Sequence, residues 1–253
     1  MLRNQFPVIS VFIAMLGLSF ILTQASPALA VEPHLRASEH GEQWIGIAAT
    51  KTSWFSYSGV SYAPFDIIQL PGFRLRAAGG YGQYYYDSSL IINGASTPIR
   101  FMGETGAIEA LLGYQFRFGE WTAKVFAGVE YQEHLIQPFD PGNEINGAQT
   151  GAKFISENWL NLGAHAFASL DGSYATSLNS YSLDLKSAYN IWGPIYLGGV
   201  IGAFGNEKYD AVRAGLLLRY KDDAREITFT GGMSGDYDDT SNPFGSVTLL
   251  TAF

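Results

Sequence analysis

The chain has 253 residues, of which 47% are hydrophobic and 15% aromatic, but only 15% are charged. A soluble domain usually carries about 25% charged residues, so this composition indicates many strands with a partly apolar outer surface. The formal net charge of −8 argues against binding to nucleic acid, because contacts to phosphates need clustered Lys and Arg. The chain has no cysteine, which excludes disulfides, thiol catalysis, cysteine metal sites and a lipoprotein anchor.

The first thirty residues have the parts of an export signal. Arg3 supplies a positive start, Val8 to Leu22 is mostly apolar, and Ala28-Leu29-Ala30 matches a small-x-small cleavage site. We expect cleavage after Ala30, followed by a short segment at 31–41. A retained membrane helix is the alternative, but the apolar run is shorter than the roughly 20 residues that a span needs. No later segment is a credible transmembrane helix, so a membrane location requires strands.

The rest of the chain alternates with a period of two, which is typical of half-buried strands. From Ile108 to Phe118 the even positions are apolar, and after a turn at Gly119-Glu120 the odd positions from Trp121 to Tyr131 are apolar. The pattern recurs at 160–169, 181–191, 212–220 and 226–234. Around Trp44, Trp54 and Ile195 both faces are apolar or small, and strands are only weakly indicated there.

Soluble sandwiches also alternate, so the ends of the apolar faces decide between the two architectures. Aromatic residues stand at those ends, as in the interfacial girdles of membrane barrels. They are Tyr114, Phe116, Phe118, Trp121, Tyr131, Tyr181, Tyr189 and Tyr220.

The connections also alternate in length, as they do in outer-membrane barrels. The long ones are 87–99, 134–149, 171–179, 205–208 and 235–243. The short ones are Gly119-Glu120, the region of Asn158, Trp192-Gly193-Pro194 and 221–225, and the exception among them is 63–72. We therefore predict an all-β protein: one antiparallel up-and-down transmembrane β-barrel of about twelve strands, spanning 42–253.

The C-terminus resembles the signal that outer-membrane barrels present to their assembly machinery. The chain ends in an alternating strand, Val247 to Phe253, with an aromatic last residue. Thr251 stands where an apolar residue is more usual. We expect this strand to engage the barrel-assembly machinery, and the apolar wall to contact outer-membrane lipid.

The search for catalytic chemistry finds little. No histidine pair has the H-x-x-x-H spacing of metal ligands. His165 and Ser169 suggest the His-Ser pair of outer-membrane phospholipases, but a nucleophile also needs a third orienting group. We expect His165 to lie on a strand, with its side chain facing the barrel lumen. The acidic loops around Asp140 and Asp236 lack calcium-loop spacing. We predict no enzyme activity, no metal and no cofactor.

The predicted inner face carries both signs of charge. Its charged residues are Arg74, Arg76, Glu104, Glu109, Arg117, Lys124, Glu130, Lys153, Glu157, Arg213 and Arg219. Glu109, Arg117, Lys124, Glu130 and Arg219 are the candidate lumen residues. Buried charges are tolerated when paired, so the lumen holds either an ion-pair network or a conducting, ligand-binding channel. Twelve strands lie between filled eight-stranded barrels and open porins of about sixteen, so strand number leaves both open.

Several motifs occur in a recognisable order. They are 59–65, 74–84, Leu112-Gly113-Tyr114-Gln115, Trp192-Gly193-Pro194 and Gly205-Asn206-Glu207-Lys208-Tyr209-Asp210, followed by Arg213 and Gly215. Together they resemble the cellulose biosynthesis protein BcsS family of proteobacteria. The resemblance implies a Gram-negative outer-membrane barrel that is accessory to cellulose synthesis or secretion, with cellulose or other secretion components as partners. It supplies no catalytic residues.

The last of these motifs is the candidate contact for a glucan or a partner, because it falls at a loop and the top of a strand. Its residues are Asn206, Glu207, Tyr209, Asp210 and Arg213. A small-solute porin and a lipid-modifying outer-membrane enzyme are the alternative functions.

Overall fold

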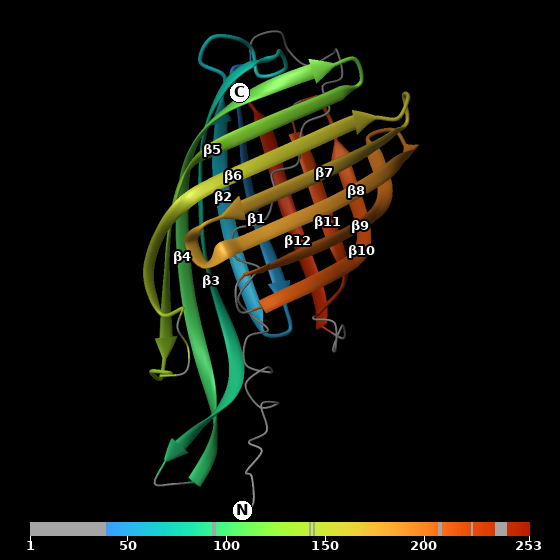
Figure 1. Ribbon diagram of the computed structural model, residues 1–253. Helices are drawn as coiled ribbons and strands as arrows, with labels where there is room; N and C mark the ends of the chain where they lie inside the picture. The colour runs from blue at the N-terminus through green and yellow to red at the C-terminus, as the bar shows by residue number, and fades with distance from the viewer. Residues whose placement is uncertain are drawn as a thin grey trace, which may run out of the picture.

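The computed structural model describes residues 39–92, 95–141, 143, 145–206, 209–223, 225–235 and 242–253. These residues form a closed antiparallel barrel in which each strand pairs with its neighbours in sequence and the last pairs with the first (Figure 1). The strands are β1 (Gly41–Thr50), β2 (Ser53–Tyr62), β3 (Gly72–Ile92), β4 (Ala95–Phe118), β5 (Trp121–Gln137), β6 (Gly147–Asn161), β7 (Ala166–Ala175), β8 (Ser180–Trp192), β9 (Ile195–Asn206), β10 (Tyr209–Lys221), β11 (Arg225–Gly235) and β12 (Asn242–Ala252). The predicted fold class and strand number are confirmed.

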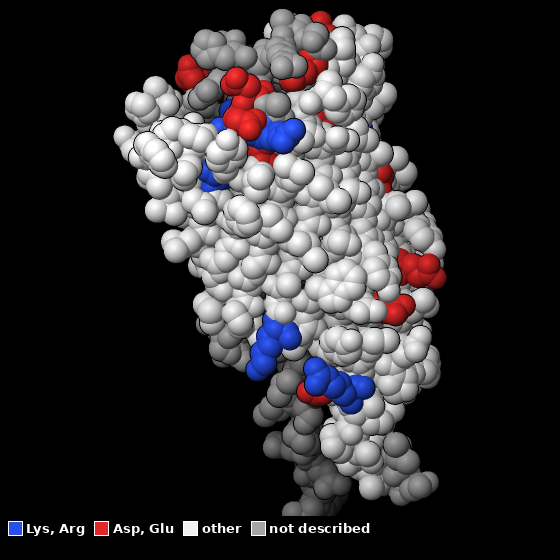
Figure 2. Space-filling view, turned by 180° about the vertical axis from the view of Figure 1, so that it is seen from behind, with Lys and Arg blue, Asp and Glu red and all other residues white. Residues whose placement is uncertain are grey.

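The period of two sends apolar side chains outward and polar ones inward, as predicted. On β4, Ile108 and Leu112 are 63% and 55% exposed, whereas Glu109 and Gln115 are buried. Figure 2 shows a broad uncharged area on one face, with the charged side chains lying mostly towards its ends and edge. A lipid-facing wall needs this inversion, because the hydrocarbon core accepts apolar side chains and the charges must lie inside or at the rims. Among the described residues, no helix is long and apolar enough to cross a membrane.

Several short turns lie at one end of the barrel, which we call the turn end. They include Gly119-Glu120, Trp192-Gly193-Pro194 and 221–225, which confirms these three predicted turns. Aromatic side chains pack against one another beside the turn at Gly119-Glu120. The ring centroids of Phe116 and Phe118 lie 6.2 Å apart, and those of Phe118 and Trp121 lie 5.4 Å apart. We call the opposite end the loop end.

Both ends of the barrel sequence meet at the turn end. The backbone N–H of Gly41 donates to the carbonyl of Phe253 at 2.9 Å, and the N–H of Phe253 donates back at 2.9 Å. The ring of Phe253 lies over Gly41, where a Cβ would collide with it. Glycine at this position therefore lets the terminal ring lie flat across the seam between β12 and β1.

The expected connector at 87–99 is wrong. Strands β3 and β4 continue to pair as far as Ile92 with Ala95, whereas β2 pairs with β3 only up to Tyr84 and β5 pairs with β4 only from Met102. The two strands thus run on past their neighbours as a two-stranded extension, which projects from the loop end at the bottom of Figure 1. The sequence indicates a connector there because the segment is rich in Ser, Asn, Gly and Pro, which are typical of loops.

The expected strand at 160–169 and the turn near Asn158 are also wrong. Residues 162–165 form the turn, β6 runs through Asn158, and β7 continues to Ala175, so that 171–175 is strand instead of connector. The sequence did not indicate this turn because Leu162 and Ala164 stand at the same alternate positions as the apolar residues of the strands on either side. His165 consequently lies exposed on the turn instead of facing the lumen.

The predicted export signal and the loop residues Glu144, Glu207 and 236–241 lie outside the described residues.

Candidate functional site in the barrel lumen

The lumen is filled with paired charges. Glu109, Lys124, Glu130 and Arg219, four of the five candidate lumen residues, face inward and are between 1% and 6% exposed. Each has an opposite charge: Arg76 Nε lies 3.0 Å from Glu109, Lys124 Nζ 2.7 Å from Glu42, Lys153 Nζ 2.7 Å from Glu130, and Arg219 contacts Glu226. Arg117 lies on the same face but is exposed beside the turn at Gly119, so it takes no part in this interior.

Some of these pairs span the lumen instead of following the wall. Arg76 on β3 donates to Glu157 on β6 at 2.9 Å, and Lys124 on β5 donates to Glu42 on β1 at 2.7 Å. Neither pair of strands is adjacent in the barrel. A second Glu157 oxygen lies 3.9 Å from Lys124 and joins the two bridges into one cluster. An extended polymer passing through the lumen would have to break these contacts.

A second crossing layer lies nearer the turn end. The indole of Trp159 on β6 and the ring of Phe167 on β7 stack with centroids 4.1 Å apart. The guanidinium carbon of Arg219 on β10 lies 4.7 Å from both centroids. A desolvated cation over aromatic faces is stabilised by the ring quadrupoles. The side chain of Arg219 therefore joins β10 to β6 and β7 across the barrel.

The long connection at 63–71, the exception among the short turns, covers the turn end. Arg74 on the inner face of β3 donates to the carbonyls of Ile68 at 2.9 Å and Leu70 at 2.5 Å. The amide of Gln115 on β4 donates to the carbonyls of Gln69 at 3.3 Å and Leu70 at 3.2 Å. Ile68 is 3% exposed, so this loop is folded onto the inward side chains.

The loop end is covered by two further connections. Ile145, between β5 and β6, and Leu178, in the short helix η3 (Ser177–Asn179) between β7 and β8, pack into one buried cluster with Tyr84 and Tyr86. The Tyr86 hydroxyl donates to Asp140 at 2.8 Å and accepts from Asn143 at 3.0 Å. These contacts hold the β5–β6 connection over the lumen.

Asn206, Asp210 and Arg213, the members of the predicted contact motif whose side chains the structure describes, do not lie on one surface. Arg213 faces the lumen, where it donates to Asp184 at 2.9 and 2.5 Å. Asp210 is exposed on the wall and accepts from the Tyr181 hydroxyl at 2.6 Å. Asn206 is buried and pairs in register with Tyr209 across the β9–β10 hairpin.

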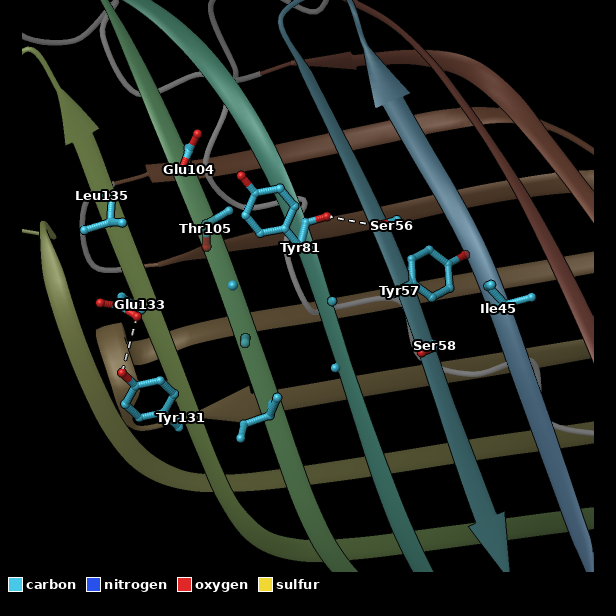
Figure 3. Close-up of a pocket in the computed structure, with 15 residues that line it drawn as sticks. Ile45, Ser56, Tyr57, Ser58, Tyr81, Glu104, Thr105, Tyr131, Glu133 and Leu135 are labelled. Carbon is cyan, nitrogen blue, oxygen red and sulfur yellow. Dashed lines mark hydrogen bonds between the residues drawn. The ribbon is translucent and has the colours of Figure 1, made fainter.

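Glu104, expected in the lumen, faces outward instead and lines a hollow of about 600 Å³ in the wall (Figure 3). The hollow forms because small residues occupy outward positions on neighbouring strands, where large side chains would otherwise stand. They are Ser56, Ser58, Gly79 and Gly106. Glu133 and Tyr131 also line it, with the Tyr131 hydroxyl 3.5 Å from Glu133. The hollow is lined by apolar side chains and by the two carboxylates, and it lies on the outer, lipid-facing side of the barrel. The alternation in the sequence did not predict this hollow.

No group of three or more His, Cys, Asp or Glu side chains that could hold a metal ion occurs in the described part of the chain.

Comparison with solved structures gives the class of the protein. A KdgM porin is 10% identical over 84% of this chain and 99% of its own, with a TM-score of 0.52. The transport unit of the autotransporter AIDA-I from Escherichia coli is 8% identical over 90% of this chain and 95% of its own, also with a TM-score of 0.52. At such low identity these likenesses show the fold, which is that of outer-membrane β-barrels.

The sequence model of the cellulose biosynthesis protein BcsS family matches residues 43–253, and the chain belongs to that family. The resemblance seen in the sequence is thereby confirmed. No curated protein matches the chain.

Proposed function

We propose that this protein is a non-enzymatic barrel in the outer membrane of a Gram-negative bacterium, where it assists the synthesis or secretion of cellulose. Family membership supports the link to cellulose. The observation that carries the accessory role is the pair of bridges across the lumen, Arg76–Glu157 and Lys124–Glu42. A solute pore needs free passage, and breaking buried ion pairs leaves desolvated charges at a cost of several kcal/mol each.

The positions of His165 and Ser169, the candidate catalytic pair, support the non-enzymatic part of the proposal. Ser169 is buried inside the barrel, while His165 lies on an exposed turn. General-base activation of a serine needs the two side chains within hydrogen-bond reach.

The proposed partners follow from the surfaces. The exposed apolar wall would contact outer-membrane lipid, and the terminal strand ending at Phe253 would contact the assembly machinery. The β9–β10 hairpin with Asp210, together with Tyr181 beside it, is the proposed contact for cellulose or for another secretion component.

A deletion strain tests the function. Extracellular cellulose, measured by dye binding and biofilm mass, should fall in the deletion strain and return with the wild-type gene. Complementation with Glu130→Lys, which reverses a buried charge, should restore less cellulose per folded barrel than the exposed control Arg117→Glu. Barrel abundance is measured in parallel.

Two outcomes would replace the proposal. Normal cellulose in the deletion strain, together with solute flux through purified protein in bilayers, would establish a small-solute porin. Hydrolysis or acylation of lipid by purified protein would establish an outer-membrane enzyme.

A further inference from the structure

Buried polar groups without partners gather at one place in the lumen. In the described part of the chain, eleven buried side-chain nitrogen and oxygen atoms have no hydrogen-bond partner. Five of them belong to four residues near the loop end: Tyr84, Thr105, Gln132 and His134. Buried polar atoms are nearly always satisfied by protein, water or ligand, so a concentration of atoms without protein partners marks a place where water or a ligand binds.

The sheet register brings these four side chains together on the inner face. Thr105 on β4 lies directly opposite His134 on β5, and Gln132 precedes His134 by two residues, which puts it on the same face. Tyr84 on β3 pairs with Gly103, two residues before Thr105. The rings of Tyr84 and His134 have centroids 6.5 Å apart. All four side chains are 5% exposed or less.

Glycine at position 103 contributes to this arrangement. A Cβ there would collide with the ring of Tyr84, so only glycine lets the ring lie against β4. Tyr84 stacks on Tyr86 with ring centroids 6.2 Å apart, and Tyr86 stacks on Phe101 with centroids 5.1 Å apart. The polar group therefore adjoins an aromatic stack.

The chemistry of the group selects its ligand. Threonine and tyrosine hydroxyls donate and accept, a neutral imidazole does each once, and the glutamine amide nitrogen donates. None of the four is a carboxylate, lysine or arginine, in contrast to the paired charges elsewhere in the lumen. The group therefore offers no opposite charge to an anion or a cation, whereas its mixture of donors and acceptors matches the hydroxyl groups of a sugar, which both donate and accept.

We propose that Tyr84, Thr105, Gln132 and His134 form a binding site for an uncharged sugar residue at the loop end of the lumen. The site rests on the proposed function for one point, the choice of a β-linked glucan as its first ligand. Ile145 and Leu178 pack in the same buried cluster as Tyr84, so the site lies beneath the side chains that cover the loop end of the lumen.

The test is calorimetric titration of folded, detergent-solubilised protein with cellotetraose. Thr105→Val and Tyr84→Phe remove one unpartnered hydroxyl each while keeping the shape of the side chain, and each should weaken binding about tenfold. The matched control is Tyr57→Phe, because the Tyr57 hydroxyl already bonds Thr248 at 2.6 Å. This control should bind as the wild type does.

Thermal unfolding without sugar separates binding from folding. Tyr57→Phe should lower the unfolding temperature because Thr248 loses its partner, whereas Tyr84→Phe should not, because its hydroxyl has no partner. A Tyr84→Phe protein that is as stable as wild type and binds sugar less well supports the site.

The outcomes distinguish the site from the cellulose role. If maltotetraose binds as well as cellotetraose and the same variants weaken both, the site stands and the cellulose assignment loses this support. If folded protein binds neither sugar, or if the variants bind as wild type does, the site is refuted and the four side chains are satisfied by water alone. Preference for tetragalacturonate would also refute it, since that ligand is charged.

Discussion

Most of the buried cations described in the lumen are paired with a carboxylate, and several of these also lie over an aromatic ring. Arg76 contacts two carboxylates, and its guanidinium carbon lies 4.6 Å from the ring centroid of Trp44. A buried ion pair adds little net stability to a fold, but removing one partner leaves the other charge buried and unpaired, at a cost of about 3–5 kcal/mol. Single substitutions at these residues should therefore be much more damaging than paired ones.

Lys153 and Glu130 form the simplest pair on which to test this. Lys153→Met leaves the Glu130 carboxylate with only the Ser177 hydroxyl, which donates to it at 2.7 Å. We expect a loss of about 3–5 kcal/mol in the free energy of unfolding, measured by urea denaturation of protein in lipid vesicles.

The double variant Lys153→Met with Glu130→Gln should recover most of that loss, because no unpaired charge remains. Arg117→Glu, an exposed change, should stay within about 0.5 kcal/mol of wild type. A single variant as stable as the double one would mean that water already reaches Glu130.

Phe253 should govern assembly. Deleting it removes both backbone hydrogen bonds to Gly41 and the ring that covers the glycine, so the seam loses its last pair. We expect less folded barrel in the outer membrane, quantified by immunoblotting of unboiled samples. Phe253→Tyr keeps the backbone and the ring and should assemble normally; wild-type levels after deletion would show that the terminal residue is dispensable.

At the scale of elements, the extension of β3 and β4 stands apart from the barrel. Beyond Tyr85 and Phe101 the two described strands pair with each other and with no other strand, and Ile91 is 81% exposed. A lone hairpin is marginally stable in water. The near part of the extension, with Tyr86 and Phe101, is packed in the buried cluster, so it is the far end that contributes little to the barrel.

Replacing Leu90–Thr97 by Asn-Gly, a favoured two-residue hairpin turn, should leave the barrel intact. Leu90 packs partly on the buried cluster, so we expect a loss of about 1 kcal/mol in unfolding free energy. The measurement is the heat-dependent gel shift with urea denaturation, and failure of the shortened chain to fold would show that the extension guides folding.

The loop 63–71 should depend on one side chain. Arg74→Met removes the donor to two carbonyls, and bonds from a charged donor are each worth about 1.5–3 kcal/mol. Backbone amides of 63–71 should exchange with deuterium about a hundredfold faster, while the strands keep their protection. Arg225→Met, an exposed change at another turn, is the control, and unchanged exchange in Arg74→Met would show that other contacts hold the loop.

The sequence predicted the strands best where one face is polar and the other apolar, and its indications were weak or wrong where the two faces do not differ in polarity. Around Trp44 the strand was weakly indicated because Trp44 itself points inward, over Gly59, while Ile45 points to lipid and is 59% exposed. The turn at 162–165 was missed because apolar residues continued the period. Local patterns place Glu109 and Lys124 on the inner face, but they carry no information on partners such as Arg76 and Glu157, which are 81 residues apart.

At the scale of the whole molecule, the outer wall requires lipid or detergent. Large apolar side chains such as Leu216, which is 70% exposed, cover it on all sides, and exposed patches of that extent aggregate in water. The purified protein should be soluble only in detergent and should run faster on gels when unboiled. N-terminal sequencing of the same sample should begin at Val31. A single unshifted band from detergent-free extracts would contradict the barrel.

The pairing of β12 with β1 leaves no open edge among the described strands of the barrel. Nine pairs of residues, from Glu42 with Ala252 to Thr50 with Phe244, join the two strands, and Gly41 exchanges two hydrogen bonds with Phe253. Without either strand, the backbone N–H and C=O groups of the other would face the membrane unpaired, which hydrocarbon does not tolerate. The two strands that are farthest apart in the sequence are therefore required together for the wall to be compatible with lipid.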